Sequence, residues 1–261
     1  MTELMVWSAV GIFASMTAVW LASLRLRDAS IVDVFWGLGF VGAASIGLAI
    51  GDGVAGRRIF IFILIAVWGV RLATYIAMRN RGAGEDPRYM KMRQRAGDSF
   101  WWESLMRVFW LQGAIMWVVA LPLMAVAAGT SPTFPSASDV IGAALWAIGV
   151  FFEAVGDRQL RTFKRDPANK GKVMDRGLWR YTRHPNYFGD AAMWWGVAVI
   201  AAGVPWGWAT AVGPALMTFF LMKVSGVALL EKSLASTKPE YADYVQRTSA
   251  FVPRLPKPAG S

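Results

Sequence analysis

The 261-residue sequence contains no cysteine and a single histidine. Without cysteine the chain can form no disulfide, no thiolate metal site, no CxxC redox pair and no cysteine nucleophile. One histidine also argues against a histidine-rich metal centre, so we expect no metal site. Charge is scarce as well, because charged residues make up 17% of the chain and hydrophobic residues 56%. A soluble domain carries more charge than this, and the composition therefore favours a membrane protein.

Apolar segments recur along the chain at lengths that suit a lipid bilayer, whose hydrocarbon core is about 30 Å thick. We identify seven of them, at residues 4–24, 31–50, 59–78, 104–128, 139–160, 187–202 and 206–230. No basic residue precedes Arg25, so the first segment lacks the basic start of a cleavable signal and is expected to stay as a helix. The sequence thus predicts an all-α integral membrane protein, a bundle of about seven transmembrane helices forming a single domain over 1–261.

The positive charge is uneven among the connections between these segments. Of the 27 Lys and Arg, 22 fall in alternate connections and the tail: two in 25–27, six in 79–95, nine in 158–183 and five in 232–257. The intervening connections hold only Arg57 and Arg58. Because cytosolic loops are enriched in Lys and Arg, this pattern predicts an outside N-terminus and a cytosolic C-terminus, in the cytoplasmic (inner) membrane if the source is bacterial. The long polar segments 79–103 and 161–186 are expected to form a cytosolic cap.

Ionisable residues at membrane depth are costly and are therefore functional candidates. Asp33 lies near the inner start of the second segment, and Arg71 and Tyr75 lie one turn apart in the third. From Glu153 to Arg165 every fourth residue is charged, so one helical face carries two acids followed by two bases. Ion pairs between helices, or arginine anchors at the headgroups, are the alternative interpretation. Most of these residues fall in the cytosolic half, which favours a site there.

The stretch GLGFVG, Gly37 to Gly42, matches the G-x-G-x-x-G pattern of dinucleotide-binding loops. That fingerprint requires a preceding strand and a following helix in a soluble βαβ unit. Here it lies inside an apolar segment, so we interpret its glycines as positions of close helix packing.

The densest polar cluster surrounds the single histidine, in DRGLWRYTRHPNYFGDAAMWWG at residues 175–196. Its pattern W-x-x-x-R-H-P-N-Y-x-G-D resembles the membrane steroid 5α-reductase superfamily. That superfamily includes sterol C14 and C24(28) reductases, a bacterial reductase-like branch, and isoprenylcysteine and phospholipid methyltransferases that share RHPxYxG. The segments DVFWGLGF, RNRGAGEDPRY, SGVALLEKSL and RTSAFVPRLP resemble the bacterial branch, so the resemblance extends over nearly the whole chain.

The resemblance implies NADPH bound at the cytosolic mouth of the bundle. Carried over residue by residue, it assigns the nicotinamide end to Trp179, Asn186 and Tyr187, with Asp190 nearby. The other implied cofactor-binding residues are Arg71, Arg81, Asp157, Lys164, His184, Glu231 and Tyr241. The residue types agree, because Arg and Lys suit phosphates, Asn and Asp can hold amides and hydroxyls, and Trp and Tyr can stack on a ring. A solvated basic loop at the membrane surface is the alternative interpretation of RYTRHP.

The resemblance also implies a reaction, hydride transfer from NADPH to a C=C bond conjugated to a ketone. The family expectation for the substrate is a Δ4-3-ketosteroid or another lipophilic enone that enters from the bilayer. The enolate oxygen needs a hydrogen-bond donor, and a proton must be delivered. Asp33 is the first catalytic candidate, Tyr75 the second and His184 the third, whereas the catalytic tyrosine of the animal enzymes aligns near Trp68.

Two other functions compete with the reductase. An S-adenosylmethionine-dependent membrane methyltransferase would share RHPNYFG, but such enzymes carry a Glu-Glu pair where LLEKS has one Glu. A non-enzymatic sterol or lipid binder would leave the basic cytosolic cluster without a purpose. Nucleic acid is disfavoured because the charge is split among membrane loops. Membrane lipids are the remaining expected partners, and no obligate protein partner is evident.

Overall fold

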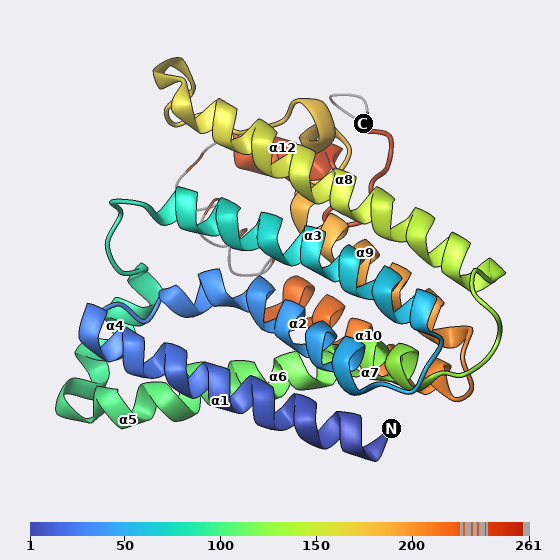
Figure 1. Cartoon of the computed structure of the whole chain (residues 1–261). Coiled ribbons are helices and arrows are strands. Elements are labelled where there is room, and N and C mark those ends of the chain that lie inside the picture. Colours follow the sequence, from blue (N-terminus) through green and yellow to red (C-terminus); the bar gives the residue numbers. More distant parts are fainter. Residues whose placement is uncertain (225–226, 228–230, 232–233, 235–237, 239, 258–261) are drawn as a thin grey trace. The chain divides into compact units, whose positions relative to one another are not determined.

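Every regular element that the structure describes is a helix, which confirms the all-α prediction (Figure 1). The structure is a computed structural model that describes residues 1–224, 227, 231, 234, 238 and 240–257. The chain divides into two compact units, each packed mainly within itself. Unit 1 comprises Met1–Asp139 and Ala201–Gly213, and unit 2 comprises Val140–Ile200 and Pro214–Ser261. The single domain expected from the sequence stays a prediction.

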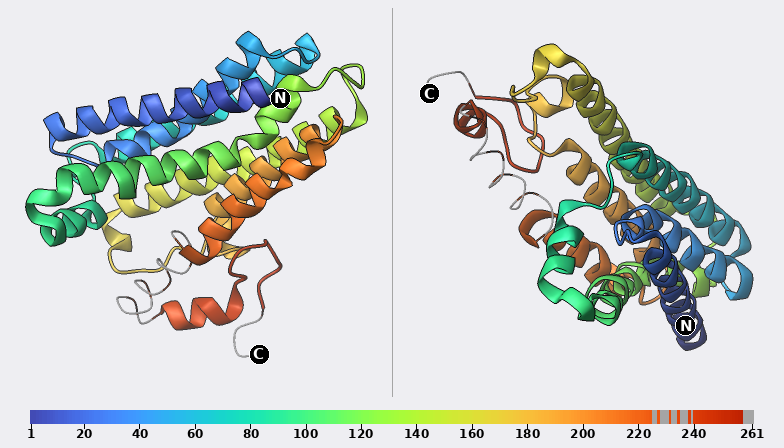
Figure 2. Two further views of the ribbon diagram at one scale, coloured as in Figure 1. Left: turned by 90° about the horizontal axis from the view of Figure 1, so that it is seen from below. Right: turned by 90° about the vertical axis from the view of Figure 1, so that its left-hand side faces the viewer.

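Unit 1 contains three long helices followed by a series of shorter ones. In chain order they are α1 (Thr2–Leu26), α2 (Ile31–Ile50), α3 (Ala55–Asn80), α4 (Pro87–Ala96), the 3-10 turn η1 (Gly97–Ser99), α5 (Phe100–Ser104), the π-helical turn η2 (Leu105–Trp110), α6 (Leu111–Val119), α7 (Leu121–Ala128) and the 3-10 helix η5 (Gly207–Ala211). Helix α2 packs against both α1 and α3, and α6 runs alongside α1 (Figure 2).

Glycines allow α2 and α3 to touch through their backbones. A Cβ added at Gly37 would lie 2.5 Å from the carbonyl oxygen of Gly69, and the reverse distance is also 2.5 Å. A Cβ at Gly39 would lie 2.4 Å from the sulfur of Met116. The interpretation of GLGFVG as a packing motif is therefore confirmed at Gly37 and Gly39. It is wrong at Gly42, where an added Cβ would meet no described atom within 4 Å, because this residue faces away from the contact.

Unit 2 contains most of α8 (Ala137–Arg165), and most of α9 (Pro185–Ala202) and α10 (Val212–Phe219). Its shorter elements are η3 (Pro167–Asn169), η4 (Gly177–Arg180), the π-helical turn η6 (Phe220–Val224) and α12 (Tyr241–Arg247). Near the end of α8, Phe163 lines a small cavity together with Tyr244 and Arg247 of α12.

Glycines spaced seven residues apart bring α8 and α9 into backbone contact. A Cβ at Gly149 would lie 2.4 Å from the nitrogen of Met193, and one at Gly189 would lie 2.4 Å from the nitrogen of Glu153. Two turns further along α8, a Cβ at Gly156 would lie 3.1 Å from the ring of Pro185. The first residue of α9, in the middle of RHPNY, is therefore seated directly on α8.

Among the residues that the structure describes, five helices are long and apolar enough to cross a bilayer: Thr2–Leu26, Ile31–Ile50, Ala55–Asn80, Ala137–Arg165 and Gly207–Val224. Pro87–Val119 and Leu121–Ala128, bent by 43° at their junction, make a sixth if they form one broken span. Along α3 the exposed residues Ile59, Ile63, Val67 and Val70 form an apolar stripe at helical spacing. Several long apolar helices with such surfaces indicate a membrane protein.

The expected number of seven spans is not confirmed. Helix α9 forms where residues 187–202 were expected to cross, but its first two turns contain Pro185, Asn186 and Asp190, which lower the mean hydropathy of an 18-residue helix. The last expected span, 206–230, is described as a helix to Val224, and residues 225–226 and 228–230 lie outside the described part.

Candidate active site

The turn η4 holds Trp179 against α8. The Trp179 ring nitrogen donates to the carbonyl oxygen of Gly156 at 3.1 Å, and the Leu178 amide donates to the Gln159 side chain at 3.0 Å. The Tyr244 hydroxyl donates to the carbonyl oxygen of Trp179. Trp179 is buried. In RYTRHP, the stretch read alternatively as a solvated loop, Arg180 and Tyr181 are exposed, whereas residues 182–185 are buried.

An acid and an amide meet where α8 and α9 touch. The Asn186 side chain donates to the Asp157 carboxylate at 3.2 Å, and Asp157 is buried. Glu153, one turn earlier on α8, is buried as well. Both acids face α9 because the glycine contacts bring this side of α8 against it. The charged row read from the sequence is thus a buried acidic pair followed by the more exposed Arg161 and Arg165.

His184 and Arg183 both contact Glu231. The Arg183 Nε atom donates to the Glu231 carboxylate at 2.8 Å, and the His184 Nε2 atom lies 3.2 Å from the same oxygen. The His184 ring stacks on Tyr187, with centroids 5.6 Å apart and planes 6° from parallel. Arg183 also donates to the carbonyl oxygens of Val245 and Thr248. The motif therefore joins the end of the last predicted span to the tail.

The C-terminal tail folds back on the motif, as its length allows. The Arg183 amide donates to the Ser249 carbonyl at 2.9 Å, and the Arg254 amide donates to the Tyr181 carbonyl at 3.0 Å. The Thr182 hydroxyl donates to the Phe251 carbonyl at 2.7 Å. These bonds place α12, with Tyr241 and Tyr244, over the same loop.

Burial controls the protonation of this cluster. It lowers the pKa of His184, because a charged imidazolium is costly away from water, and this effect outweighs the attraction of Glu231. Burial alone would raise the pKa of Glu231, but the hydrogen bond and charge of Arg183 lower it overall. Burial, aided by the Glu231 charge, raises the pKa of Tyr241 to about 12. At neutral pH the cluster therefore contains a neutral His184 and an ionised Glu231.

We expect the melting temperature of the solubilised protein to fall as the pH drops from about 7 to about 5. The pKa of folded His184 lies below its ordinary 6.5, so the unfolded chain binds the proton more tightly and stability is lost below pH 6.5. The lowered pKa of Glu231 adds a loss below its ordinary 4.5. His184→Gln should flatten the upper part of this profile, because the chain has no other histidine. An unchanged slope in His184→Gln by scanning fluorimetry would contradict this assignment.

A second polar network lies in unit 1 around Asp33. The Tyr89 hydroxyl donates to one oxygen of the Asp33 carboxylate at 2.8 Å, and Arg88 donates to the other at 2.7 Å. The Gln112 side chain donates to the Tyr89 hydroxyl at 3.3 Å. Tyr89 is only 6% exposed and the Asp33 side chain 17% exposed. A carboxylate, a phenol and an amide, contributed by α2, α4 and α6, thus form one chain of hydrogen bonds.

The loop before α4 fixes this network to the start of α2. Glu85 accepts from the Ala29 amide at 2.7 Å and pairs with Arg93 at 2.8 Å. Asp86 caps α4 by accepting from the Arg88 amide. Burial would raise the pKa of Glu85, but its hydrogen bonds with Arg93 and Ala29 lower it overall. The carboxylate of Glu85 thus holds the residues just before α2 against α4.

The predicted residues are divided between the two units. Unit 1 holds Asp33, Arg71, Tyr75 and Arg81; unit 2 holds Asp157, Lys164, Trp179, His184, Asn186, Tyr187, Asp190, Glu231 and Tyr241. Within unit 2 the structure brings together Asp157 with Asn186, and His184 with Tyr187 and Glu231. Within unit 1 the structure pairs Asp33 with Tyr89 and Arg88.

Residues 19–248 match the family described as "Protein of unknown function (DUF1295)". The chain belongs to the DUF1295 family. No solved structure matches the chain.

Individual relatives of this DUF1295 chain fall into both enzyme classes considered above. This chain is 35% identical to 3-oxo-5-alpha-steroid 4-dehydrogenase 1 of Bos taurus over 71 residues. Those residues make up 27% of this chain and 27% of that protein. The chain is 28% identical over 113 residues to "Probable O-methyltransferase ustE" of Ustilaginoidea virens, 43% of this chain and 34% of that protein. These two matches therefore span about a third or less of each relative.

A third relative covers most of the chain. "Uncharacterized protein C594.04c" of Schizosaccharomyces pombe is 27% identical over 270 residues, 91% of this chain and 76% of that protein. The comparisons support a DUF1295 protein related to steroid 5α-reductase-like enzymes, and they include a reductase and a methyltransferase alike.

Sequence reasoning missed Tyr89 and Arg88 as candidate site residues of this DUF1295 chain. The segment RNRGAGEDPRY was noted as a family resemblance without a role for its last two residues. Asp86 followed by Pro87 does predict a helix start, which the structure confirms. Nothing in the local pattern shows that this helix returns to Asp33, which is 56 positions before Tyr89.

Proposed function

We propose that this protein is an NADPH-dependent membrane reductase that saturates a C=C bond conjugated to a ketone in a lipophilic substrate. The observation that carries the proposal is the charge around the motif. Residues 158–183 contain nine Lys and Arg but only two acids, Asp166 and Asp175. NADPH presents a pyrophosphate and a 2′-phosphate to such a surface, and these anionic groups are attracted to it. S-adenosylmethionine carries a net positive charge, so the same basic surface would repel it.

The residues of unit 2 fit the cofactor in kind. Asp157 and Asn186 together offer a carboxylate and an amide for the carboxamide and ribose hydroxyls. Trp179, Tyr187 and His184 offer planar rings, two of them already stacked on each other. The exposed Lys164 at the end of α8 offers a charge for phosphate. Asp190, Glu231 and Tyr241 are the other residues of unit 2 that the resemblance implies.

When bound, NADPH supplies the hydride that reaches the β-carbon of the enone. The role of unit 2 is to hold and orient the cofactor, with the tail covering the motif so that water is excluded. With His184 neutral and Glu231 ionised, Arg183 keeps its ion pair with Glu231 and its hydrogen bond to the Thr248 carbonyl in the tail. By the positive-inside pattern this face is cytosolic, where NADPH is available.

We assign the substrate carbonyl to the network in unit 1. The enone gains the hydride at its β-carbon and a proton at its α-carbon, and between these events negative charge collects on its oxygen. A phenol in a dry environment stabilises such charge by donating a hydrogen bond. The single proton of the Tyr89 hydroxyl points to Asp33 in this structure, so Tyr89 donates to the substrate oxygen by turning that proton away from the carboxylate. Arg88 then still holds Asp33, and Gln112 still donates to the Tyr89 hydroxyl oxygen. Asp33, the first catalytic candidate, then acts by orienting the donor.

The substrate class follows from the membrane setting. A lipophilic enone dissolves in the bilayer and can enter laterally, so a Δ4-3-ketosteroid is the first compound to test. The alternative function is an S-adenosylmethionine-dependent methyltransferase. The match to the O-methyltransferase, which covers more of this chain than the dehydrogenase match does, favours it.

Ligand protection separates the two functions. With each ligand at about 100 times the expected Kd, NADPH should stabilise the detergent-solubilised protein by about 2.7 kcal/mol, roughly 5–10 °C in melting temperature. NADH should give a smaller shift because it lacks the 2′-phosphate, and S-adenosylmethionine should give none. Stabilisation by S-adenosylmethionine without any effect of NADPH would replace the reductase by the methyltransferase.

A further inference from the structure

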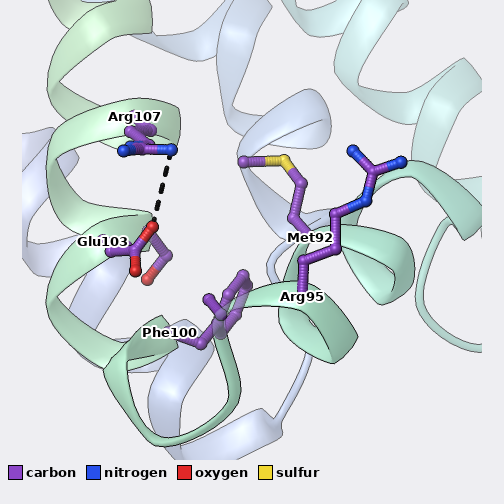
Figure 3. A pocket seen from close by; sticks show the side chains of 7 residues that line it. Met92, Arg95, Phe100, Glu103 and Arg107 are labelled. Atoms are coloured by element: carbon purple, nitrogen blue, oxygen red, sulfur yellow. Dashed lines mark ion pairs between the residues drawn. The ribbon is translucent and has the colours of Figure 1, made fainter.

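A cavity of about 360 Å³ opens between α4 and the helix formed by α5 and η2, apart from the Asp33 network. Its lining residues are Met92, Arg95 and Ala96 of α4, Phe100, Glu103 and Ser104 of α5, and Arg107 of η2. Figure 3 shows Arg107 and Glu103 on one side, Arg95 and Met92 on the other, and Phe100 between them at the base. All seven residues belong to unit 1.

The charge of the lining is positive and incompletely paired. Arg107 is 71% exposed and lies 3.6 Å from Glu103, a long contact for an ion pair. Glu103 also accepts a hydrogen bond from the Ser99 hydroxyl. In the part of the chain that the structure describes, Arg95 has no ion-pair partner. The cavity is therefore lined by two guanidinium groups and one carboxylate, and among the described residues that carboxylate pairs only with Arg107, at a long distance.

The remainder of the lining is apolar, and the surroundings are suited to a membrane interface. Met92, Ala96 and Phe100 form a hydrophobic wall next to the two arginines. On the same short helix as Phe100, Trp101 and Trp102 are 57% and 47% exposed. Exposed tryptophans gather at the level of lipid headgroups, where one side of the ring is apolar and the other hydrated. Cations and apolar atoms in one cavity match an amphiphile better than a simple ion.

The adjoining turn η2 supports a binding role. It is a π-helical turn, Leu105–Trp110, inserted between two α-helical segments. Such turns cost helix stability and occur frequently at functional sites, because the extra residue widens the helix and re-aims its side chains. Here the turn carries Arg107 at the rim of the cavity.

We propose that this cavity holds the phosphodiester headgroup of an anionic membrane lipid. Arg95 and Arg107 bind the phosphate, and the glycerol end of the acyl chains lies along Met92, Ala96 and Phe100. The guanidinium of Arg95 has no described partner to hold it away and reorients toward the phosphate. Because α4 also supplies Tyr89 and Arg88 to Asp33, a lipid in this cavity anchors the helix on which that network depends.

The test is calorimetric titration of the solubilised full chain with dioctanoyl phosphatidylglycerol, dioctanoyl phosphatidylcholine and inorganic phosphate. Wild type should bind the phosphatidylglycerol at least about tenfold more tightly than the phosphatidylcholine. It should bind inorganic phosphate more weakly than either lipid. Arg95→Gln/Arg107→Gln should raise the Kd for the phosphatidylglycerol at least about tenfold. Ala96→Phe, which fills the cavity and leaves every charge in place, should do the same.

A matched charge control is available on unit 1. Arg25 and Arg27 are exposed at the end of α1, so Arg25→Gln/Arg27→Gln removes the same charge outside the cavity. It should change the Kd by less than about twofold. If this control weakens lipid binding as much as the cavity variants do, the lipid is held by diffuse electrostatic attraction, and the proposed site would be overturned. Unchanged binding in both cavity variants, equal affinity for the two lipids, or inorganic phosphate binding as tightly as the phosphatidylglycerol would also overturn it.

Discussion

Tyr89→Phe is expected to lower the rate of enone reduction by about 10- to 1,000-fold, the range for losing one positioned donor or acid. The substitution keeps the buried ring and removes only the hydroxyl that joins Asp33 to Gln112. The rate should be measured per molecule competent to bind NADPH, so that misfolded protein does not enter the ratio. NADPH affinity should stay within about twofold of wild type.

Asp33 should behave as the partner of this hydroxyl. Asp33→Asn is expected to lower turnover by about one to a few orders of magnitude while keeping NADPH binding, and Asp33→Leu by more, because leucine cannot accept a hydrogen bond at all. Asp86→Asn is the matched control, since Asp86 is the other carboxylate that pairs with Arg88, and it contacts Tyr89 through its backbone carbonyl, which the substitution leaves in place. It should retain most of the turnover.

The rival candidate for the proton donor is Tyr75, whose ring lies under Arg79 on α3. Tyr75→Phe should have a small effect if Tyr89 is the donor. Full activity in Tyr89→Phe together with loss in Tyr75→Phe would move the assignment to Tyr75. An Asp33→Leu protein with unchanged turnover per competent molecule and a lower melting temperature would make Asp33 a structural residue.

Asn186→Ala is expected to raise the Kd for NADPH at least about tenfold, about 1.4 kcal/mol. It removes the amide that hydrogen-bonds to the buried carboxylate of Asp157, so both proposed polar contacts of the cofactor are disturbed. Tyr187→Ala should weaken binding similarly, because it removes the ring stacked on His184. Calorimetric titration measures both constants.

Asn169→Ala provides the control for that loss. Asn169 lies in η3 of the same cap, where its side chain donates to the carbonyl of Phe163 and to Asp166. Its substitution perturbs the cap without touching the motif, so NADPH affinity should stay near that of wild type. If Asn169→Ala weakens binding as much as Asn186→Ala, the motif acts only through the stability of the cap.

The long helices were predictable because each coincides with a local run of apolar residues. The run at 31–50 became α2 at the same residues, and the glycines of GLGFVG became a helix contact at Gly37. The span expected at 187–202 is a helix but is not confirmed as a span, because the polar first turns of α9 lower its mean hydropathy. The bend between Pro87–Val119 and Leu121–Ala128, and the π-helical turn at Leu105–Trp110, leave no comparable local pattern.

The candidate site was predictable only where its residues are close in sequence. Asn186, Tyr187 and His184 lie within one motif, and Asp157 was found by the four-residue spacing of charges on α8. The hydrogen bonds between Tyr89, Asp33 and Gln112 join three helices. They form because Glu85 holds α4 against the residues just before α2. Such docking depends on the geometry of the whole unit, which no single-sequence pattern records.

The central claim, hydride transfer from NADPH to an enone, is tested most directly by isotope labelling. The solubilised protein would be incubated with NADPH deuterated at the transferable C4 position and a Δ4-3-ketosteroid or related lipophilic enone, and the product analysed by mass spectrometry. The account predicts a saturated ketone with a single deuterium at the former β-carbon and, in D2O with unlabelled NADPH, deuterium at the α-carbon instead. A product that gains a methyl group from labelled S-adenosylmethionine, with no deuterium from NADPH in any enone tested, would contradict it.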